Sequence, residues 1–304
     1  MPGGSQDEGT HVFGQLVHFG AMAAASLNRA QRTAQAETHS AMRLPGVPSS
    51  IPAALLAAFL ALPLLGLLIR AGGNSNLAGS LTKPIVIEAL KLSLIATAAV
   101  LVITLALGSP LALLLARRRG PMIGALDTLV DLPIVLPPAV AGLALLLTLG
   151  RRGVLGGPLQ ALGLELPFTT AAVVLAGIFV AAPFYIRAAR SGFLAVPREI
   201  EDAAKVEGAS GWQLFRHVTV PLAAPSLLGG AVLCWARALG EFGATIMFAG
   251  SFPGRTQTMP LAIYAALESD TDAAIGLSVL LLGLSFLMLL LFRRWLRGTA
   301  DARL

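Results

Sequence analysis

"EDAAKVEGASGWQLFRHVTVPLAAP", Glu201–Pro225, places five charged side chains and a histidine in a chain that is otherwise mostly apolar. Pro197 stands where a helix would begin, and the acidic residues that follow it complement a helix dipole. Gly208 is suited to end that helix in the left-handed conformation. The stretch therefore predicts a short helix from about Pro197 to Glu207, a turn, and a second helical stretch through Phe215.

The composition around this stretch indicates an integral membrane protein. Of 304 residues, 56% are hydrophobic and 12% are charged, which is far from the balance of a soluble domain. Several uncharged runs reach the roughly 20 helical residues that cross a hydrocarbon core. Aromatic residues are sparse and no period-two alternation occurs, so we predict an all-α protein with six transmembrane helices. The predicted spans are Leu44–Ile69, Leu92–Ala116, Leu132–Gly150, Leu166–Ile186, Pro221 to about Phe248, and Ala273–Phe292.

Lys and Arg are distributed unevenly between the segments that join these spans. Most of them fall in the N-terminal tail, the loop at Arg117–Arg119, the loop from Arg187 to Arg216 and the C-terminal tail. The positive-inside rule places all four segments, and with them both termini and the opening stretch, in the cytoplasm. In a soluble protein the net charge of +6 would suggest a nucleic-acid partner, but here the distribution of the charges matters more than their sum, so we expect none.

The chain divides into three parts. Residues 1–43 form an N-terminal extension that we expect to be disordered or loosely helical, residues 44–296 a transmembrane domain, and residues 297–304 a cytoplasmic tail. The extension lacks a basic region followed by a long apolar core, so it is a poor signal peptide. Translation from Met42 is an alternative interpretation. Cys234, the single cysteine, is expected to be a small buried apolar side chain without an internal disulfide.

The spacing of the opening stretch is similar to the EAA loop of permease subunits of bacterial ABC importers. An acidic pair and two alanines are followed at the family's offsets by Gly208, Phe215, Val218 and Pro221. The resemblance implies that the loop, about 197–221, forms a coupling helix between the fourth and fifth spans and sits in a groove of an ATPase subunit. The implied coupling residues are Glu201, Asp202, Ala203, Ala204, Gly208 and Ala209.

Two features of this loop leave alternatives open. Many family members carry one Glu where this chain has Glu201 and Asp202, so either carboxylate is a candidate for the coupling role. On residue types alone, an amphipathic loop solvated at the lipid headgroups is an equally good interpretation.

Two further stretches resemble the molybdate permease subunit: "DLPIVLPPAVAGLALLLTLGRRGVLGG", Asp131–Gly157, and "ALGEFGATIMFAGSFPGRTQTMPLAIY", Ala238–Tyr264. Sulfate permeases share the element Gly240–Gly243, so sulfate and tungstate remain alternatives to molybdate. The resemblance implies a multi-pass permease of the bacterial cytoplasmic (inner) membrane that works by alternating access. Its implied partners are a second copy of itself, two cytoplasmic ATP-binding subunits, an extracytoplasmic oxyanion-binding protein and membrane lipid.

The chain itself contains no site for ATP hydrolysis. It has no Gly-x-x-x-x-Gly-Lys-Ser/Thr loop, so we expect neither a catalytic residue nor a cofactor here, and the partner ATPase subunits would bind ATP and Mg²⁺. A membrane-embedded enzyme is disfavoured because the four histidines lie in the tail or the polar loop, where no metal or nucleophile cluster surrounds them. An ATP-independent secondary transporter would favour titratable residues near the midplane or an internal repeat, and neither is found.

The outer half of the fifth span carries the candidate pathway. Arg237 and Glu241 are four residues apart, so they are expected to pair on one helix, either as part of an outer gate or as a lock between helices. The pathway or gate candidates are Arg237, Gly240, Glu241, Gly243 and Thr245, in which the glycines allow close helix approach. The outer-mouth candidates are Arg255, Thr256 and Thr258, a cation and hydroxyls suited to weak oxyanion contacts. Loop solvation and helix capping are the alternative roles. Pro137 and Pro138 are expected to kink or start the third span.

Overall fold

A computed structural model describes residues 50–73, 79 and 81–301. The predicted extension 1–43, the alternative start at Met42 and the last three residues lie outside this range. Contacts divide the chain into two units, Met1–Pro63 and Leu64–Leu304. All regular structure in the described residues is helical, as the composition predicts.

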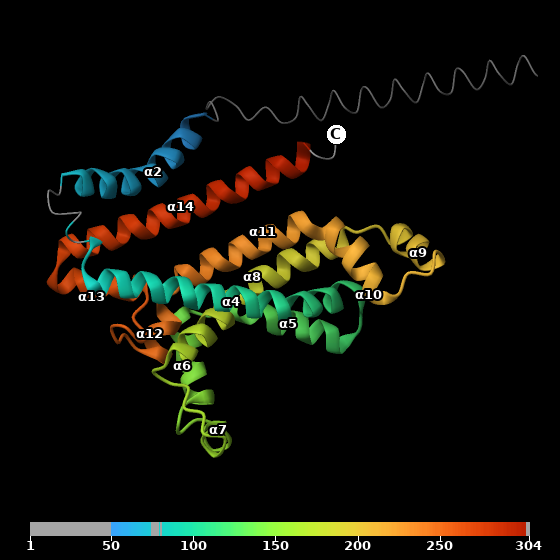
Figure 1. Cartoon of the computed structure of the whole chain (residues 1–304), viewed down its shortest axis with the longest axis horizontal. Coiled ribbons are helices and arrows are strands. Elements are labelled where there is room, and N and C mark those ends of the chain that lie inside the picture. Colours follow the sequence, from blue (N-terminus) through green and yellow to red (C-terminus); the bar gives the residue numbers. More distant parts are fainter. Residues whose placement is uncertain (1–49, 74–78, 80, 302–304) are drawn as a thin grey trace, which may run out of the picture. The chain divides into compact units, whose positions relative to one another are not determined.

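Figure 1 shows the helices, coloured along the chain. The boundary between the two units lies inside α2. The elements are α2 (Ser50–Gly72), α4 (Pro84–Arg117), α5 (Pro121–Val135), α6 (Pro138–Leu149), α7 (Gly156–Ala161), α8 (Thr170–Leu194), α9 (Arg198–Val206), α10 (Gly211–Leu214), the π-helix η1 (Phe215–Thr219), α11 (Val220–Leu239), α12 (Gly243–Ala249), α13 (Met259–Ser269) and α14 (Thr271–Asp301).

Helix α8 organises the core of the unit Leu64–Leu304. It packs along both α4 and α11, and α12, α5 and α6 also contact it. Small side chains allow this close packing, and the buried cluster around Phe193 and Tyr185 fills the spaces between the helices. Cys234 on α11 is buried in the same cluster as a free thiol, which agrees with its predicted role.

Five helices in the described residues are long and apolar enough to cross a membrane, and the pair α5 and α6 is a sixth if it forms one span. The predicted third span, Leu132–Gly150, is not one straight helix, because α5 and α6 meet at an angle of 118°. Pro137 and Pro138 explain the break, since proline lacks a backbone N–H and restricts the residue before it. The predicted kink at these prolines is confirmed.

Two other boundaries differ from the predictions. Helix α11 ends at Leu239, so the fifth span does not continue to Phe248, and a separate helix α12 follows after Phe242. Helix α8 extends to Leu194, which places Arg187 and Arg190 inside the helix and not in a loop.

Candidate functional site

The polar stretch folds into an elbow of two short helices. Helix α9 begins after Pro197 and ends before Glu207, as predicted. Gly208 has a φ of 86°, a conformation that side chains with a β-carbon rarely adopt. Ser210 then forms a capping box with Gln213 at the start of α10, and η1 leads directly into α11. We call residues 197–219 the elbow.

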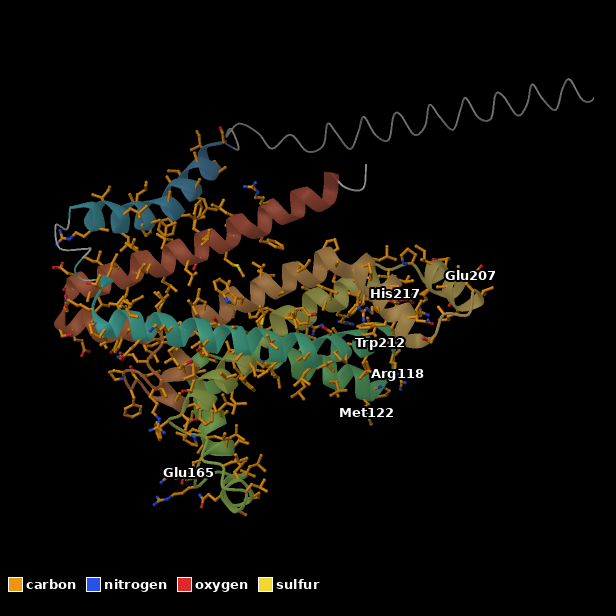
Figure 2. All side chains as sticks on the ribbon, in the orientation of Figure 1. Arg118, Met122, Glu165, Glu207, Trp212 and His217 are labelled. Carbon is orange, nitrogen blue, oxygen red and sulfur yellow. The ribbon has the colours of Figure 1, made fainter. Side chains whose placement is uncertain are left out.

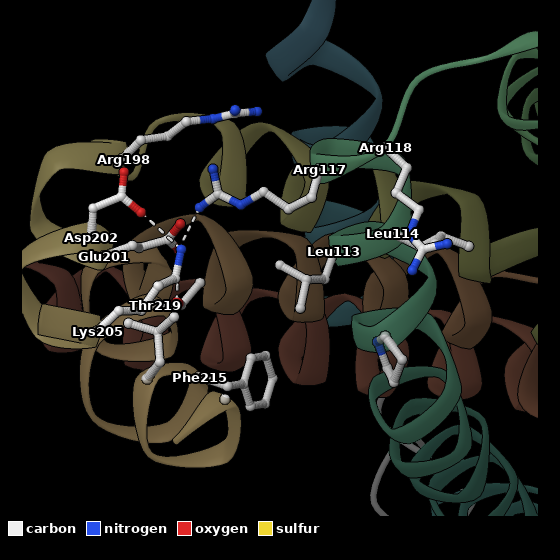
Figure 3. Close-up of a pocket in the computed structure, with 13 residues that line it drawn as sticks. Leu113, Leu114, Arg117, Arg118, Arg198, Glu201, Asp202, Lys205, Phe215 and Thr219 are labelled. Atoms are coloured by element: carbon white, nitrogen blue, oxygen red, sulfur yellow. Dashed lines mark hydrogen bonds and ion pairs between the residues drawn. The ribbon is translucent and has the colours of Figure 1, made fainter. Parts of the chain in front are cut away.

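Glu201 is buried inside the elbow, with 8% of its surface exposed. Arg117 Nη2, at the end of α4, lies 2.5 Å from Glu201 Oε1. The Thr219 hydroxyl donates to the same oxygen at 2.9 Å, as Figure 3 shows. A single carboxylate therefore links α9 to α4 and to the last residue of η1. A half-buried pair of this kind holds the elements together because leaving either partner unpaired is costly.

Asp202, the next residue, has the opposite environment. Its side chain is 68% exposed and accepts a hydrogen bond from Lys205 Nζ at 2.8 Å. This hydrogen bond and the positive charge of Lys205 lower the pKa of Asp202 below its ordinary value. The two carboxylates that the sequence leaves equivalent are thus distinct, since Glu201 serves an internal contact and Asp202 faces outward.

The remaining predicted coupling residues lie on the face of the elbow that points away from the other helices, which we call its outward face. Ala203 and Gly208 are exposed, whereas Ala204 and Ala209 are half-buried. The structure adds two large apolar side chains that the sequence did not single out, Val206 at 86% and Trp212 at 67% exposed. In Figure 2, Trp212 and Glu207 lie at the same end of the unit. Apolar side chains flanking the Gly208 turn could have signalled this face, because a two-helix elbow has too little interior to bury them.

A second polar site occupies the break between α11 and α12. Arg237 Nη1 lies 2.6 Å from Glu241 Oε2, which confirms the predicted pair. The pair does not lie on one continuous helix, however, because Gly240 ends α11. The other carboxylate oxygen of Glu241 accepts a hydrogen bond from the backbone N–H of Ala244 at 2.7 Å. Glu241, only 3% exposed, therefore fixes the break and caps the first turn of α12.

Helix α12 packs tightly against α6 next to this break. A β-carbon on Gly243 would lie 2.7 Å from Pro138 Cβ, and one on Gly142 would lie 2.6 Å from the carbonyl oxygen of Ala244. Thr245 is buried on the same helix. A β-carbon on Gly240 would meet no comparably close atom. Gly240 therefore ends helix α11 and does not allow a close approach between two helices.

The outer-mouth candidates separate into different roles. The Thr256 hydroxyl accepts a hydrogen bond from the backbone N–H of Phe252, so it stabilises the loop. Thr258 is buried, and its hydroxyl has no partner among the described residues. Gln257 Oε1 is also buried and unpartnered there, although the sequence did not mark it. Arg255 is exposed at the same loop, and its carbonyl accepts a hydrogen bond from Thr170.

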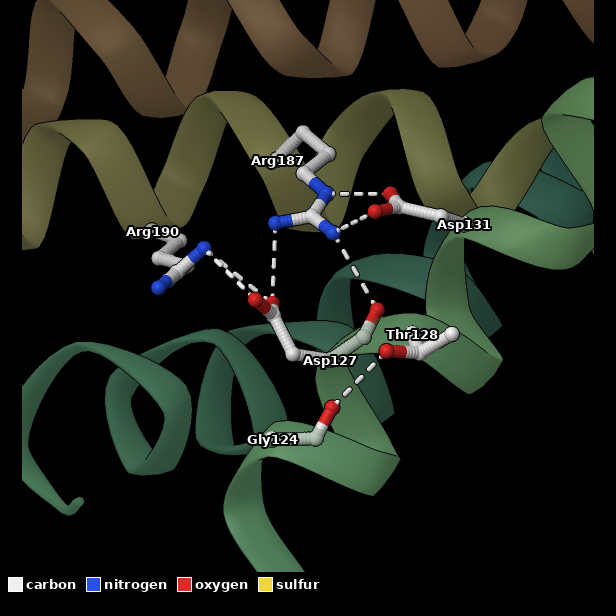
Figure 4. A network of polar contacts seen from close by, with 6 residues as sticks. All are labelled: Gly124, Asp127, Thr128, Asp131, Arg187 and Arg190. Carbon is white, nitrogen blue, oxygen red and sulfur yellow. Dashed lines mark hydrogen bonds and ion pairs between the residues drawn. The ribbon is translucent and has the colours of Figure 1, made fainter. Parts of the chain in front are cut away.

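Sequence reasoning missed one charged network, shown in Figure 4. Arg187 on α8 pairs with Asp127, at 2.8 Å, and with Asp131, both on α5. Arg190 reaches Asp127 at 3.1 Å. These contacts tie α5 to α8 just before the proline break. No group of three or more His, Cys, Asp or Glu residues that could hold a metal ion occurs in the described part of the chain.

Comparison with known proteins shows consistent similarity over most of the chain. The family model described as "Binding-protein-dependent transport system inner membrane component" matches residues 108–304. The molybdenum transport system permease protein ModB of Mycobacterium tuberculosis is 42% identical over 79% of this chain and 90% of its own length. ModB of Escherichia coli is 36% identical over 71% and 95%, respectively. The molybdate/tungstate permease WtpB of Thermococcus kodakarensis is 34% identical over 81% and 94%.

Solved structures share the fold. A chain of a bacterial ABC transporter that imports the acidic polysaccharide alginate superposes with a TM-score of 0.67, covering 82% of this chain and 93% of that chain. A chain of the MetNI methionine ABC transporter gives a TM-score of 0.52 over 74% and 98%. Their sequence identities, 17% and 18%, make this a likeness of fold alone.

Proposed function

The chain belongs to the family of binding-protein-dependent transport system inner membrane components, and we propose that it is the permease subunit of an ATP-driven molybdate importer. The observation that carries the proposal is the similarity to permeases named for molybdenum transport, at up to 42% identity over nine-tenths of their length. The apolar helices make it a multi-pass protein of the bacterial inner membrane. Tungstate is the first competitor to test, because one relative is named for both oxyanions.

We infer that the elbow is the docking surface for an ATPase subunit on the cytoplasmic side. Its outward face presents one charged residue, Asp202, one small residue, Ala203, and two large apolar residues, Val206 and Trp212. Exposed large apolar residues outside the membrane favour contact with another protein. A second copy of the chain would complete the pathway, and each copy would engage one ATPase subunit.

The elbow is connected mechanically to the opposite end of the unit. Helices α10, η1 and α11 run without interruption over 29 residues, Gly211–Leu239. At about 1.5 Å per residue, movement of the elbow would be transmitted over roughly 40 Å to the Arg237–Glu241 break. The Glu201 contacts with Arg117 and Thr219 link α9 to α4 and to η1, which leads into α11. We infer that ATP-driven motion reaches the outer break by this route.

The outer break is suited to be a gate and not a tight anion site. The carboxylate of Glu241 would repel an oxyanion at close range, so its role is to hold Arg237 and the start of α12. Weak neutral donors suit an anion that must leave again, and the buried Thr258 hydroxyl is the candidate near the mouth.

The proposal is tested by uptake of radiolabelled molybdate into proteoliposomes that hold the chain with its ATPase and oxyanion-binding partners. We expect uptake to require ATP inside the vesicles and the binding protein outside. Unlabelled molybdate and tungstate should compete, and sulfate should compete weakly. Uptake of equal rate without ATP would instead support a secondary transporter. Stronger competition by sulfate than by molybdate would show that sulfate is the substrate.

A further inference from the structure

A pocket of about 540 Å³ lies beside the elbow, between the end of α4 and the helices α9, α10 and η1. It shares Asp202 with the outward face of the elbow but is otherwise separate from that face and from the break between α11 and α12. Its wall contains both strongly charged and apolar side chains. The charged members are Arg117, Arg118, Arg198, Lys205, Glu201 and Asp202.

The charges in this pocket are not balanced. Glu201 is engaged by Arg117, and Asp202 by Lys205. Arg118 and Arg198 are exposed and form no ion pair with any described residue. Figure 3 shows Arg198, Arg117 and Arg118 following one another along one edge of the pocket. An adjoining hollow of about 740 Å³, which shares Arg117 and Arg198, adds Arg119 and one acidic residue, Glu199. This arrangement favours an anionic ligand with several acceptor oxygens.

The rest of the wall is apolar. Leu113 and Leu114 line it on α4, and Leu214 and Phe215 line it from the elbow. Pro110, also in the lining, lies about 10 Å along α4 from Arg117, on the side of the membrane span. The pocket thus has a basic edge at the end of α4 and an apolar wall that continues along the helix. A small inorganic anion has no use for such a wall, whereas a phospholipid matches both parts.

We propose that this pocket binds the phosphate-bearing headgroup of an anionic phospholipid from the cytoplasmic leaflet, with an acyl chain against α4. Basic pockets between transmembrane helices on the cytoplasmic side are suited to such headgroups. The inference rests on the proposed function in one respect, the cytoplasmic placement of the elbow. A headgroup held by Arg118, which directly follows α4, and by Arg198 of α9 reinforces the Arg117–Glu201 link between the same two helices. Anionic lipid therefore strengthens coupling between ATPase and pathway.

The test uses the complete complex of the chain with its ATPase subunits, in nanodiscs of phosphatidylcholine with or without phosphatidylglycerol. Native mass spectrometry of the complex measures the retained lipid, and ATP hydrolysis is measured in parallel. We expect selective retention of phosphatidylglycerol by the wild type. Arg118→Gln and Arg198→Gln should each weaken retention about fivefold, and the double variant about 25-fold.

Matched variants separate the pocket from general surface charge. Arg216→Gln removes an exposed cation on the same elbow that does not line the pocket, and it should leave retention unchanged. The Arg118→Lys and Arg198→Lys variants keep the charge and should retain most of the lipid. ATP hydrolysis should be faster in nanodiscs with phosphatidylglycerol than in phosphatidylcholine alone. Inorganic phosphate added to the latter should not reproduce that increase, which distinguishes a lipid from a free anion.

Three results would overturn the lipid site. The first is equal retention of both lipids, and the second is equal loss in the Arg216→Gln control. The third is retention by the isolated chain but not by the complex, which would show that the ATPase covers the pocket. Molybdate uptake in phosphatidylglycerol vesicles is scored separately. Failure of uptake in every lipid would reject the proposed function, whereas normal uptake with no lipid selectivity would reject only the site.

Discussion

Two buried glutamates lie near the two ends of the continuous helical stretch Gly211–Leu239. They have similar kinds of partner, but the partners lie at different distances along the sequence. Glu201 and Glu241 each meet an arginine and a second donor. The partner of Glu201 is Arg117, distant in sequence and on another helix. The partner of Glu241 is four residues away, and its second donor is three residues away. The Glu201 carboxylate therefore joins separate elements, whereas that of Glu241 shapes a local break.

The strongest way to break this contrast is Glu201→Ala. It leaves the half-buried guanidinium of Arg117 and the Thr219 hydroxyl without their acceptor, at a cost of about 3 kcal/mol. We expect molybdate uptake to fall to the background of empty vesicles, measured with the assembled complex. The double variant Arg117→Met/Glu201→Leu removes both charges and should recover much of the thermal stability. Additive losses in that double variant would show that the two side chains do not interact.

The Gly208 turn sets the angle between α9 and α10, so Gly208→Leu should have the next largest effect. A β-carbon at a φ of 86° is strained by about 1–2 kcal/mol, and the added side chain would also enlarge the docking face. Stimulated ATP hydrolysis and uptake should both be lost while the subunit stays in the membrane.

Replacing Gly208 by Ala or by Asn separates backbone strain from steric exclusion of a partner. No atom lies within 4 Å of a β-carbon placed on Gly208. Strain therefore penalises Gly208→Ala more than Gly208→Asn, because asparagine tolerates the left-handed region better. Steric exclusion of a partner would penalise Asn at least as much as Ala. Normal coupled uptake by Gly208→Leu would contradict the docking model.

At the break between α11 and α12, the expected loss is smaller and more local. Glu241→Gln keeps an acceptor for the Ala244 N–H but removes the ion pair with Arg237, whereas Glu241→Ala removes both. Loss of a cap costs about 1 kcal/mol. We expect ATP hydrolysis to continue in both variants and uptake to fall about tenfold in Glu241→Ala, with a smaller decrease in Glu241→Gln. Identical uptake by these two variants would show that the hydrogen bond from the Ala244 N–H to Glu241 does not contribute to transport.

The smallest effect is expected on protein stability at Asp202. Its pKa is lowered by Lys205, so any stabilisation by the carboxylate is present above the ordinary pKa of 3.8 and is lost only as pH falls through the lowered value. The difference in thermal midpoint between wild type and Asp202→Asn should therefore be constant from neutral pH down to about pH 5. A difference that changes between pH 5 and 7 would indicate a buried, shifted carboxylate instead.

Local patterns in the sequence were sufficient to predict local geometry. The start of α9 after Pro197, the left-handed Gly208 and the Arg237–Glu241 pair each depend on residues only a few positions apart. The proline pair likewise indicated a kink, although not an angle of 118°. Turn, cap and i,i+4 preferences are properties of short segments, so they can be read without the fold.

Contacts between distant segments could not be predicted in this way. The links of Arg117 to Glu201 and of Arg187 to Asp127 depend on how α4, α5 and α8 pack, and no spacing within one helix encodes them. Arg187 therefore looked like a loop cation that supports the topology. For the same reason the sequence could not distinguish Glu201 from Asp202, because only the position of α4 shows which carboxylate faces inward.

The most direct test of the docking elbow is the accessibility of one engineered cysteine. The single natural cysteine, Cys234, is buried, so Asp202→Cys provides an exposed thiol that can be labelled selectively. Inside-out and right-side-out membrane vesicles are treated with a membrane-impermeant maleimide, with and without the ATPase subunit. The account predicts rapid labelling from the cytoplasmic side and strong protection when the ATPase is bound. Labelling from the outer side, or labelling that the ATPase does not change, would contradict it.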